Sequence, residues 1–151
     1  MKTISLFGKD YFTYATVEEA DEYLNTVFGS NWAELGEVQK AQVLITATKM
    51  IDRKDYQGEK AAPDQPLKFP RIINGLKTTD MVLVEACCEL AQNIFNDGGK
   101  DKNIANLKSV SLGDSSVSFK DDFNVESEDE LIIQEYLGEY LKGGVQVILW
   151  H

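Results

Sequence analysis

The spacing of apolar residues along the chain predicts four helices. Thr16 and Glu19 have the spacing of a capping box, in which each side chain bonds the backbone N–H of the other residue, so a helix is expected from there to about Phe28. The other three are expected from Trp32 or Glu37 to Lys54, from caps at Thr78–Asp80 to about Asn96, and over Glu128–Leu141. Apolar residues in these segments recur with the helical period of about 3.6 residues.

After the third helix the period changes to two. Val110 and Leu112 alternate with serines, as do Val117 and Phe119, and a Gly-Asp pair lies between the two runs. This pattern predicts a β-hairpin over about 107–121. Residues 1–15 are expected to form an N-terminal arm, and residues 143–151, with the sequence GGVQVILWH, an extended C-terminal tail. The chain is therefore expected to be a single, mainly α domain over residues 1–151 that carries one hairpin.

The connection from Asp55 to about Thr79 contains all three prolines and the stretch QPLKFPRI at Gln65–Ile72. Loops longer than about 12–15 residues without secondary structure are uncommon and are often functional. Two interpretations are open. Leu67, Phe69 and Arg71 could hold the loop on its own domain, or Lys68 and Arg71 could contact a neighbouring subunit.

The composition gives no indication of a catalytic site, a metal site or a membrane segment. The 151 residues carry a net charge of −10, which on average repels nucleic acid. The one histidine, His151, is the last residue, and Cys87 and Cys88 are adjacent within a helical pattern, so neither a catalytic triad nor a zinc site is indicated. We expect no enzyme activity, cofactor or metal, and no membrane segment, because no apolar run approaches the roughly 20 residues that a span requires.

Charge is segregated along the chain. Lys40–Lys77 holds eight cations and four acids, a net +4, which leaves −14 for the remainder, and Asp121–Glu139 holds eight acids and no cation. This can be ordinary solvated surface, or it can support head-to-tail association of identical subunits. In the second case the contacts are expected at Arg53, Lys68, Arg71, Asp121, Asp122 and Trp150.

Several motifs occur in an order that resembles one family. They are YATVEEADEYL at Tyr14–Leu24, Trp32, QKAQVLITATKMID at Gln39–Asp52, YQGEKA at Tyr56–Ala61, QPLKFPR at Gln65–Arg71 and VEACCELAQNIF at Val84–Phe95. The chain is similar to the small phage head–tail connector proteins, also called head-completion or adaptor proteins, many of which carry the label of DnaT-like single-stranded-DNA-binding proteins. It departs from them at Tyr56, where Trp is frequent, and at Thr78–Met81, which lacks an expected Pro.

The resemblance implies a four-helix, connector-type bundle with an inserted hairpin and no enzymatic activity. It implies a homo-oligomeric ring, expected to be dodecameric, under the portal protein of a phage or prophage particle assembled in the bacterial host cytoplasm. Such a ring extends the DNA channel at the head–tail interface and offers a platform for the next tail-connector or tail-completion protein. Double-stranded DNA would pass through it without specific binding.

The alternative function is that of a single-stranded-DNA-binding, DnaT-like replication accessory protein. This function needs a basic groove with aromatic stacking platforms. Trp32, Tyr56 and Phe69 lie in or near the basic stretch and could supply the platforms, with the surface over Lys49–Arg71 as the site. The net charge of −10 counts against this alternative.

Overall fold

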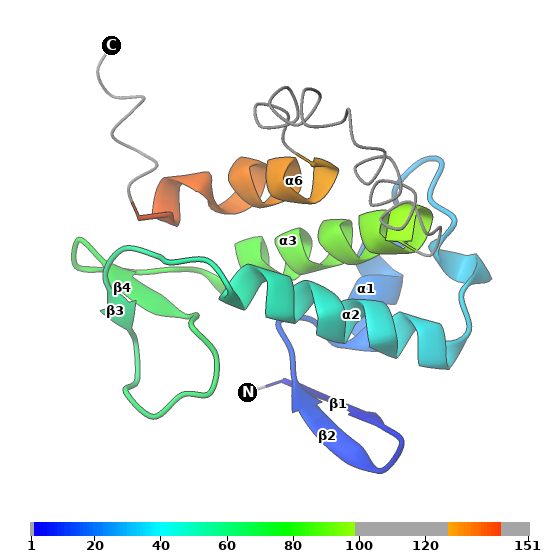
Figure 1. Ribbon diagram of the computed structural model, residues 1–151, viewed down its shortest axis with the longest axis horizontal. Coiled ribbons are helices and arrows are strands. Elements are labelled where there is room, and N and C mark those ends of the chain that lie inside the picture. The colour runs from blue at the N-terminus through cyan, green and yellow to red at the C-terminus, as the bar shows by residue number, and fades with distance from the viewer. Residues whose placement is uncertain (1, 99–126, 143–151) are drawn as a thin grey trace, which may run out of the picture.

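A computed structural model of the protein describes residues 2–98 and 127–142 (Figure 1). Its helices are α1 (Val17–Leu24), α2 (Glu37–Asp52), α3 (Asp80–Asn93) and α6 (Glu128–Leu137). Its strands are β1 (Thr3–Leu6), β2 (Lys9–Phe12), β3 (Glu59–Lys60), β4 (Arg71–Ile73) and β5 (Leu76–Lys77). Short 3₁₀ turns lie at Trp32–Glu34 and Gly138–Tyr140, and a π-helical turn at Ile94–Gly98 follows α3.

The four helices form a layered core in which α3 lies between α2 and α6, with α1 against α3 (Figure 1). All four predicted helices are present, and each is shorter than predicted at its C-terminal end. The capping box at the start of α1 is confirmed, since Thr16 Oγ1 accepts from the Glu19 backbone N–H at 3.1 Å and Glu19 Oε1 accepts from that of Thr16 at 3.0 Å. The α1 helix ends at Leu24, and Phe28 lies fully exposed in the turns that follow.

The expected N-terminal arm forms a β-hairpin that projects from the helices (Figure 1). Strands β1 and β2 pair antiparallel with Thr3 opposite Phe12 and Leu6 opposite Lys9. Phe7 and Gly8 form the turn with φ values of 52° and 80°, the positive values that tight hairpins of right-handed twist need. Ile4 is buried in the core, whereas Phe7 and Phe12 are exposed, so the hairpin presents aromatic side chains to solvent.

The long connection also contains a sheet, of order β3–β4–β5 with both pairs antiparallel. The prediction of a mainly α, four-helix connector-type bundle was therefore wrong, because the described residues form four helices and two small antiparallel sheets. Strands of two or three residues are too short to show a period of two, which is why the pattern did not indicate them. The predicted hairpin over 107–121 and tail over 143–151 lie outside the described residues.

The core between the helices is apolar with a few paired polar groups. Trp32 is completely buried, and its indole Nε1–H donates to Asp21 Oδ1 at 2.8 Å. Lys40, also buried, donates to the same oxygen at 2.8 Å. Cys87 and Cys88 are completely buried on α3 and are both free thiols. Burial raises the pKa of the Cys87 thiol to about 11.

A hydrogen-bonded junction joins the hairpin, α2 and the proline-containing loop. The Tyr14 hydroxyl, just beyond β2, donates to Asp52 Oδ1 at the end of α2 and accepts from the Phe69 backbone N–H at 3.1 Å. Asp52 also accepts from the Lys68 backbone N–H, at 3.2 Å to Oδ2. One tyrosine and one carboxylate thus fix three segments that are distant in sequence. We call this group the Tyr14–Asp52 junction.

Phe69 and Arg71 hold the loop on its own domain. Phe69 is almost completely buried, and its ring meets the rings of Tyr14 and Tyr56 edge to face, with centroids 6.1 Å and 4.7 Å away. The guanidinium of Arg71 is buried and donates to the backbone carbonyls of Gln57 at 2.8 Å, Gly58 at 2.9 Å, Lys68 at 3.2 Å and Tyr56 at 3.4 Å. Carbonyl dipoles therefore compensate the buried charge.

We predict that Gly58→Ala destabilises the protein more than Gly75→Ala. Both glycines have positive φ, 72° and 82°, so each substitution costs about 1 kcal/mol in backbone strain. A Cβ on Gly58 would also stand 2.1 Å from the carbonyl oxygen of Ile72, whereas nothing lies within 4 Å of one on Gly75. Urea unfolding followed by circular dichroism should show a further loss of about 2 kcal/mol or more for Gly58→Ala. Equal urea midpoints for Gly58→Ala and Gly75→Ala would contradict the close approach of the Ile72 carbonyl to Gly58.

We predict that Tyr14→Phe lowers the free energy of unfolding by about 2–3 kcal/mol, because it leaves the buried Phe69 N–H without its acceptor and removes one of the two donors to Asp52. The control is Tyr11→Phe, which removes a hydroxyl that forms no hydrogen bond within the part of the chain that the structure describes. The control should change stability by no more than about 0.5 kcal/mol. The measurement is the urea midpoint of unfolding for both variants. A Tyr14→Phe midpoint equal to that of the unaltered protein would show that the junction does not hold the loop.

Candidate functional site

The residues singled out from the sequence fall into three groups. Arg71 uses its donors on carbonyls of its own chain. Lys68 Nζ donates to the Lys54 carbonyl at 2.5 Å and lies 3.9 Å from Asp55, so it too is held within the subunit, although its side chain remains about one third exposed. Arg53, at the C-terminal end of α2, is exposed. Asp121, Asp122 and Trp150 lie outside the described residues.

The aromatic residues expected as stacking platforms are not available to a ligand. Trp32, Tyr56 and Phe69 are 0%, 4% and 1% exposed, respectively. Each packs in the core, and the Tyr56 hydroxyl donates to the Ile51 carbonyl at 2.7 Å. A nucleobase cannot stack on a ring that the protein already covers on both faces, so any stacking surface must be built from other residues.

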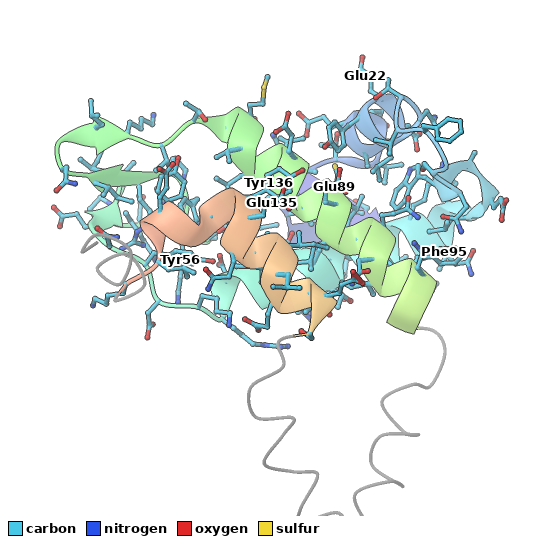
Figure 2. The ribbon with its side chains drawn as sticks, turned by 90° about the horizontal axis from the view of Figure 1, so that it is seen from above. Glu22, Tyr56, Glu89, Phe95, Glu135 and Tyr136 are labelled. Atoms are coloured by element: carbon cyan, nitrogen blue, oxygen red, sulfur yellow. The ribbon has the colours of Figure 1, made fainter. Side chains whose placement is uncertain are left out.

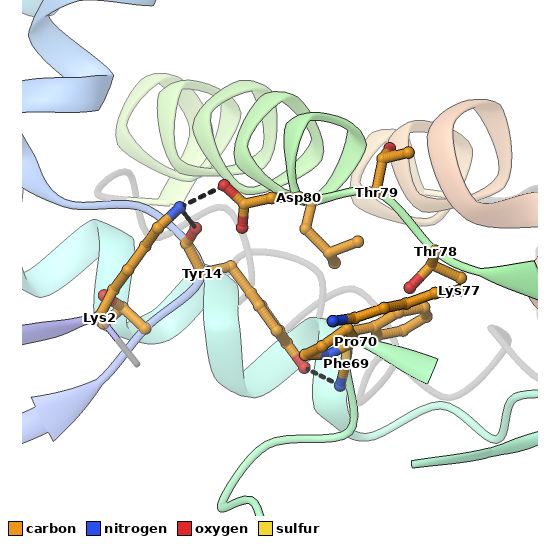
Figure 3. A pocket seen from close by; sticks show the side chains of 10 residues that line it. Lys2, Tyr14, Phe69, Pro70, Lys77, Thr78, Thr79 and Asp80 are labelled. Carbon is orange, nitrogen blue, oxygen red and sulfur yellow. Dashed lines mark hydrogen bonds and ion pairs between the residues drawn. The ribbon is translucent and has the colours of Figure 1, made fainter. Parts of the chain in front are cut away.

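One cavity, of about 540 Å³, opens beside the loop (Figure 3). It lies between the base of the hairpin, the Phe69–Pro70 segment and the start of α3, and it is lined by Lys2, Thr13, Tyr14, Phe69, Pro70, Lys77, Thr78, Thr79, Asp80 and Leu83. Lys2 is occupied there, since its ammonium donates to Asp80 at 2.7 Å and lies 3.2 Å from Glu19. Lys77 also lines the cavity, and no carboxylate of the described residues lies within 4.0 Å of it, but none of the aromatic rings in this lining is exposed.

A second cavity, of about 230 Å³, lies where the hairpin, α2 and the same loop meet. We call it the hairpin–loop pocket. It is lined by Tyr11 and Phe12 of β2, by Ile45, Thr48, Lys49 and Asp52 of α2, and by Pro66 and Leu67 of the loop. Phe12 is 45% exposed, so its ring is open to a ligand. The pocket thus joins an accessible aromatic ring, apolar walls and charged side chains.

Cations with no paired carboxylate lie at this pocket. Lys49 lines it, and Arg53 follows one helical turn later on the same face of α2. Lys60 lies near enough to Asp52 for its charge to oppose the rise that burial causes in the pKa of that carboxyl, as does Lys68, which also lies 3.9 Å from Asp55. Lys9 stands over the Tyr11 ring, 5.7 Å from its centroid. Within residues 2–98 and 127–142, no carboxylate lies within 4.0 Å of Lys9, Lys49, Arg53 or Lys60.

Asp52 is the one acid that lines this pocket. Desolvation raises the pKa of its carboxyl above the usual value, and the bonds from Tyr14 and the Lys68 N–H, together with the charges of Lys68 and Lys60, oppose that rise. It lies at the boundary between the Tyr14–Asp52 junction and the open pocket. A carboxylate in this position can accept a further hydrogen bond from a ligand, because its two oxygens offer about four acceptor sites.

The opposite side of the molecule is acidic. Glu85 and Glu89 of α3 and Glu135 of α6 surround Tyr136, and their charges raise the pKa of its hydroxyl, after the larger effect of desolvation. Tyr23 of α1 donates to Glu89 at 2.7 Å. Figure 2 views this side, with Glu22, Glu89 and Glu135 toward the observer, whereas Figure 1 shows the hairpin on the far side of α2 and α3 from α6. The acids around Tyr136 therefore lie on the side of the molecule away from the hairpin and from Lys49, which lines the hairpin–loop pocket.

The residues that sequence reasoning missed are Lys9, Tyr11 and Phe12. A usable signal was present, since Thr3–Leu6 and Lys9–Phe12 flank a Phe-Gly turn and Ile4 and Leu6 alternate with polar residues. Among the described residues, no three His, Cys, Asp or Glu side chains are grouped so that they could hold a metal ion. No helix in that part of the chain is long and apolar enough to cross a membrane.

Comparisons with known proteins bear on the family. No curated protein and no solved structure matches the chain. The family model described as "Putative DnaT-like ssDNA binding protein" matches residues 8–148, which include the hairpin strand β2, the proline-containing loop and all four helices. The comparisons bring no support for the resemblance to head–tail connector proteins. A match over nearly the whole chain shows that this protein belongs to the family that carries this description.

Proposed function

We propose that this protein binds single-stranded DNA, with the hairpin–loop pocket and the cations beside it as the binding surface. The observation that carries the proposal is the meeting of an exposed Phe12 ring with unpaired Lys49 and Arg53 on one face, among the residues that the structure describes. Proteins that bind single strands combine cations that follow the phosphates with aromatic rings on which bases stack. The description of the family agrees with this combination.

The net charge of −10 does not oppose this function once the charges are placed in space. Three acids of α3 and α6, Glu85, Glu89 and Glu135, lie around Tyr136 on the side away from the hairpin (Figures 1 and 2). Exposed charges separated by more than about 10 Å are largely screened at about 0.1 M salt. A strand lying across Lys49 and Arg53 would therefore meet a locally positive surface. The expected affinity is moderate and strongly dependent on salt, because few phosphates are neutralised.

The test is fluorescence anisotropy with labelled oligonucleotides of about 16 nucleotides, single-stranded and duplex, at low and physiological salt. We expect the single strand to bind more tightly than the duplex, and binding to weaken as salt rises. The double variant Lys49→Gln, Arg53→Gln should lower affinity about tenfold. It should also reduce the slope of log K against log salt by about 1 for each phosphate that the variant no longer neutralises.

The matched control is Asn25→Asp with Gln134→Glu, which changes exposed residues at the end of α1 and within α6. Both double variants make the net charge of −10 more negative by two. If a general charge effect governed binding, the two variants would weaken it equally. Only the α2 variant should do so if the hairpin–loop pocket is the site. Absence of binding to any single strand at low salt would overturn the proposed function.

A second candidate is a structural subunit of a phage head–tail connector, as the resemblance noted above implies. The observation that favours it is the placement of exposed charges, since Lys49 and Arg53 lie on one face of α2 and can complement the exposed acids Glu22 and Glu135 of a neighbouring copy. Complementary patches guide head-to-tail association, which closes into a ring when the rotation between subunits allows. In that function the ring would lie under a portal protein, and DNA would pass through it without specific binding.

Sedimentation velocity at low and high salt tests this second candidate. Head-to-tail association should give oligomers that dissociate as salt rises. Lys49→Glu with Arg53→Glu should prevent these oligomers, because both faces of that variant are then acidic. Mixing it with a Glu22→Lys, Glu135→Lys variant, in which both faces are basic, should restore association between the two variants. If the protein stays monomeric at low salt and high concentration, and the mixed variants do too, the free subunit does not assemble head to tail and the second candidate is contradicted.

A further inference from the structure

We propose that the hairpin–loop pocket holds one nucleobase and selects a base with an exocyclic amine, such as cytosine, over one with a carbonyl at that position, such as uracil or thymine. This inference rests on the proposed function and adds a base preference to it. The occupant follows from three properties of the pocket: its size, its apolar walls and the single carboxylate acceptor that lines it.

The size and walls fit one flat ring. The volume of about 230 Å³ leaves room for a single base and its sugar edge. Phe12 of the hairpin offers an exposed ring, and Pro66 and Leu67 of the loop and Ile45 of α2 supply further apolar lining. A base in the pocket would bury apolar surface against the Phe12 ring. In other single-strand-binding proteins, replacing such a ring by alanine costs about 1–3 kcal/mol of binding free energy for each stacked base.

The polar lining gives the preference. Asp52 is the one carboxylate that lines the pocket, and its partners in the fold, the Tyr14 hydroxyl and the Lys68 N–H, fill only part of its acceptor capacity. Carboxylates accept from the N4 amine of cytosine. Uracil presents the O4 carbonyl at the same position, and two acceptors facing each other repel. The Thr48 hydroxyl already donates to the Leu44 carbonyl at 3.0 Å, and Lys49 contacts the phosphates in the proposed function, so Asp52 is left to meet the edge of the base. Tyr11→Phe, which removes the remaining hydroxyl of the lining, should leave the base preference unchanged.

The surrounding cations keep the site compatible with a nucleic acid. Lys49, Lys60 and Lys68 stand around Asp52, so the carboxylate does not present an uncompensated negative charge to the phosphates. Asp52 is held by the Tyr14 hydroxyl and the Lys68 N–H, and it lines the pocket with acceptor capacity to spare. The fold therefore places one oriented acceptor beside one accessible aromatic ring.

The experiment compares oligo(dC) with oligo(dU) of equal length by fluorescence anisotropy at about pH 8 and low salt. The two rings have the same size, so the comparison isolates the amine from stacking. We expect oligo(dC) to bind about fivefold more tightly to the unaltered protein. Asp52→Asn should abolish this ratio, because the amide can also donate to O4. Phe12→Ala, an exposed substitution that does not touch the core, should weaken both oligonucleotides.

The outcomes separate this inference from the proposed function. Equal binding of both oligonucleotides that is still weakened by Lys49→Gln, Arg53→Gln would overturn the base preference and leave single-strand binding in place. Absence of binding to either oligonucleotide would overturn both. Should Asp52→Asn unfold the protein, the Phe12→Ala variant still decides the matter, because unchanged affinity for both oligonucleotides would show that no base occupies the pocket.

Discussion

The arrangement of the molecule depends on the bonds that Tyr14 and Asp52 form with the loop backbone. The hairpin, the end of α2 and the loop contribute one partner each, and none of these segments is long enough to be stable alone. A buried hydroxyl between a carboxylate and a backbone N–H is costly to leave unpaired, so the three segments are fixed together or not at all. Phe69 and Arg71 extend this control to the sheet of β3–β5, because Arg71 bonds the carbonyls that enter β3.

A pocket lies where these bonds bring the three segments together. Phe12 of the hairpin, Leu67 of the loop and Asp52 itself line the hairpin–loop pocket. Lys49 lines it too, whereas Glu85, Glu89 and Glu135 lie around Tyr136 on the side away from the hairpin (Figures 1 and 2). Both proposed functions use the same face of α2, the one that carries Lys49 and Arg53.

The sequence predicted what local periodicity encodes. The helices follow from apolar residues such as Leu44 and Ile51, and the start of α1 follows from the Thr16–Glu19 box. Strands β3 to β5 could not be predicted, because segments of two or three residues show no periodicity. They also depend on contacts between residues distant in sequence, such as the bond from Arg71 to the Gln57 carbonyl. The stacking residues were misassigned because Trp32, Tyr56 and Phe69 were chosen for their closeness to cations along the chain, whereas large rings in such segments usually form the core. Phe12 meets Leu67 only in the fold.

The two adjacent thiols of α3 have a practical consequence. Cys87 and Cys88 have no exposed surface, and burial holds the pKa of Cys87 far above neutrality, so little of the reactive thiolate forms in the folded protein. The natural chain is thus a suitable background for site-specific labelling without removal of its own cysteines. A cysteine introduced at Phe7, on the exposed turn between β1 and β2, would take up a maleimide dye selectively. The fluorescence of such a dye would report the binding of a molecule next to the turn of the hairpin.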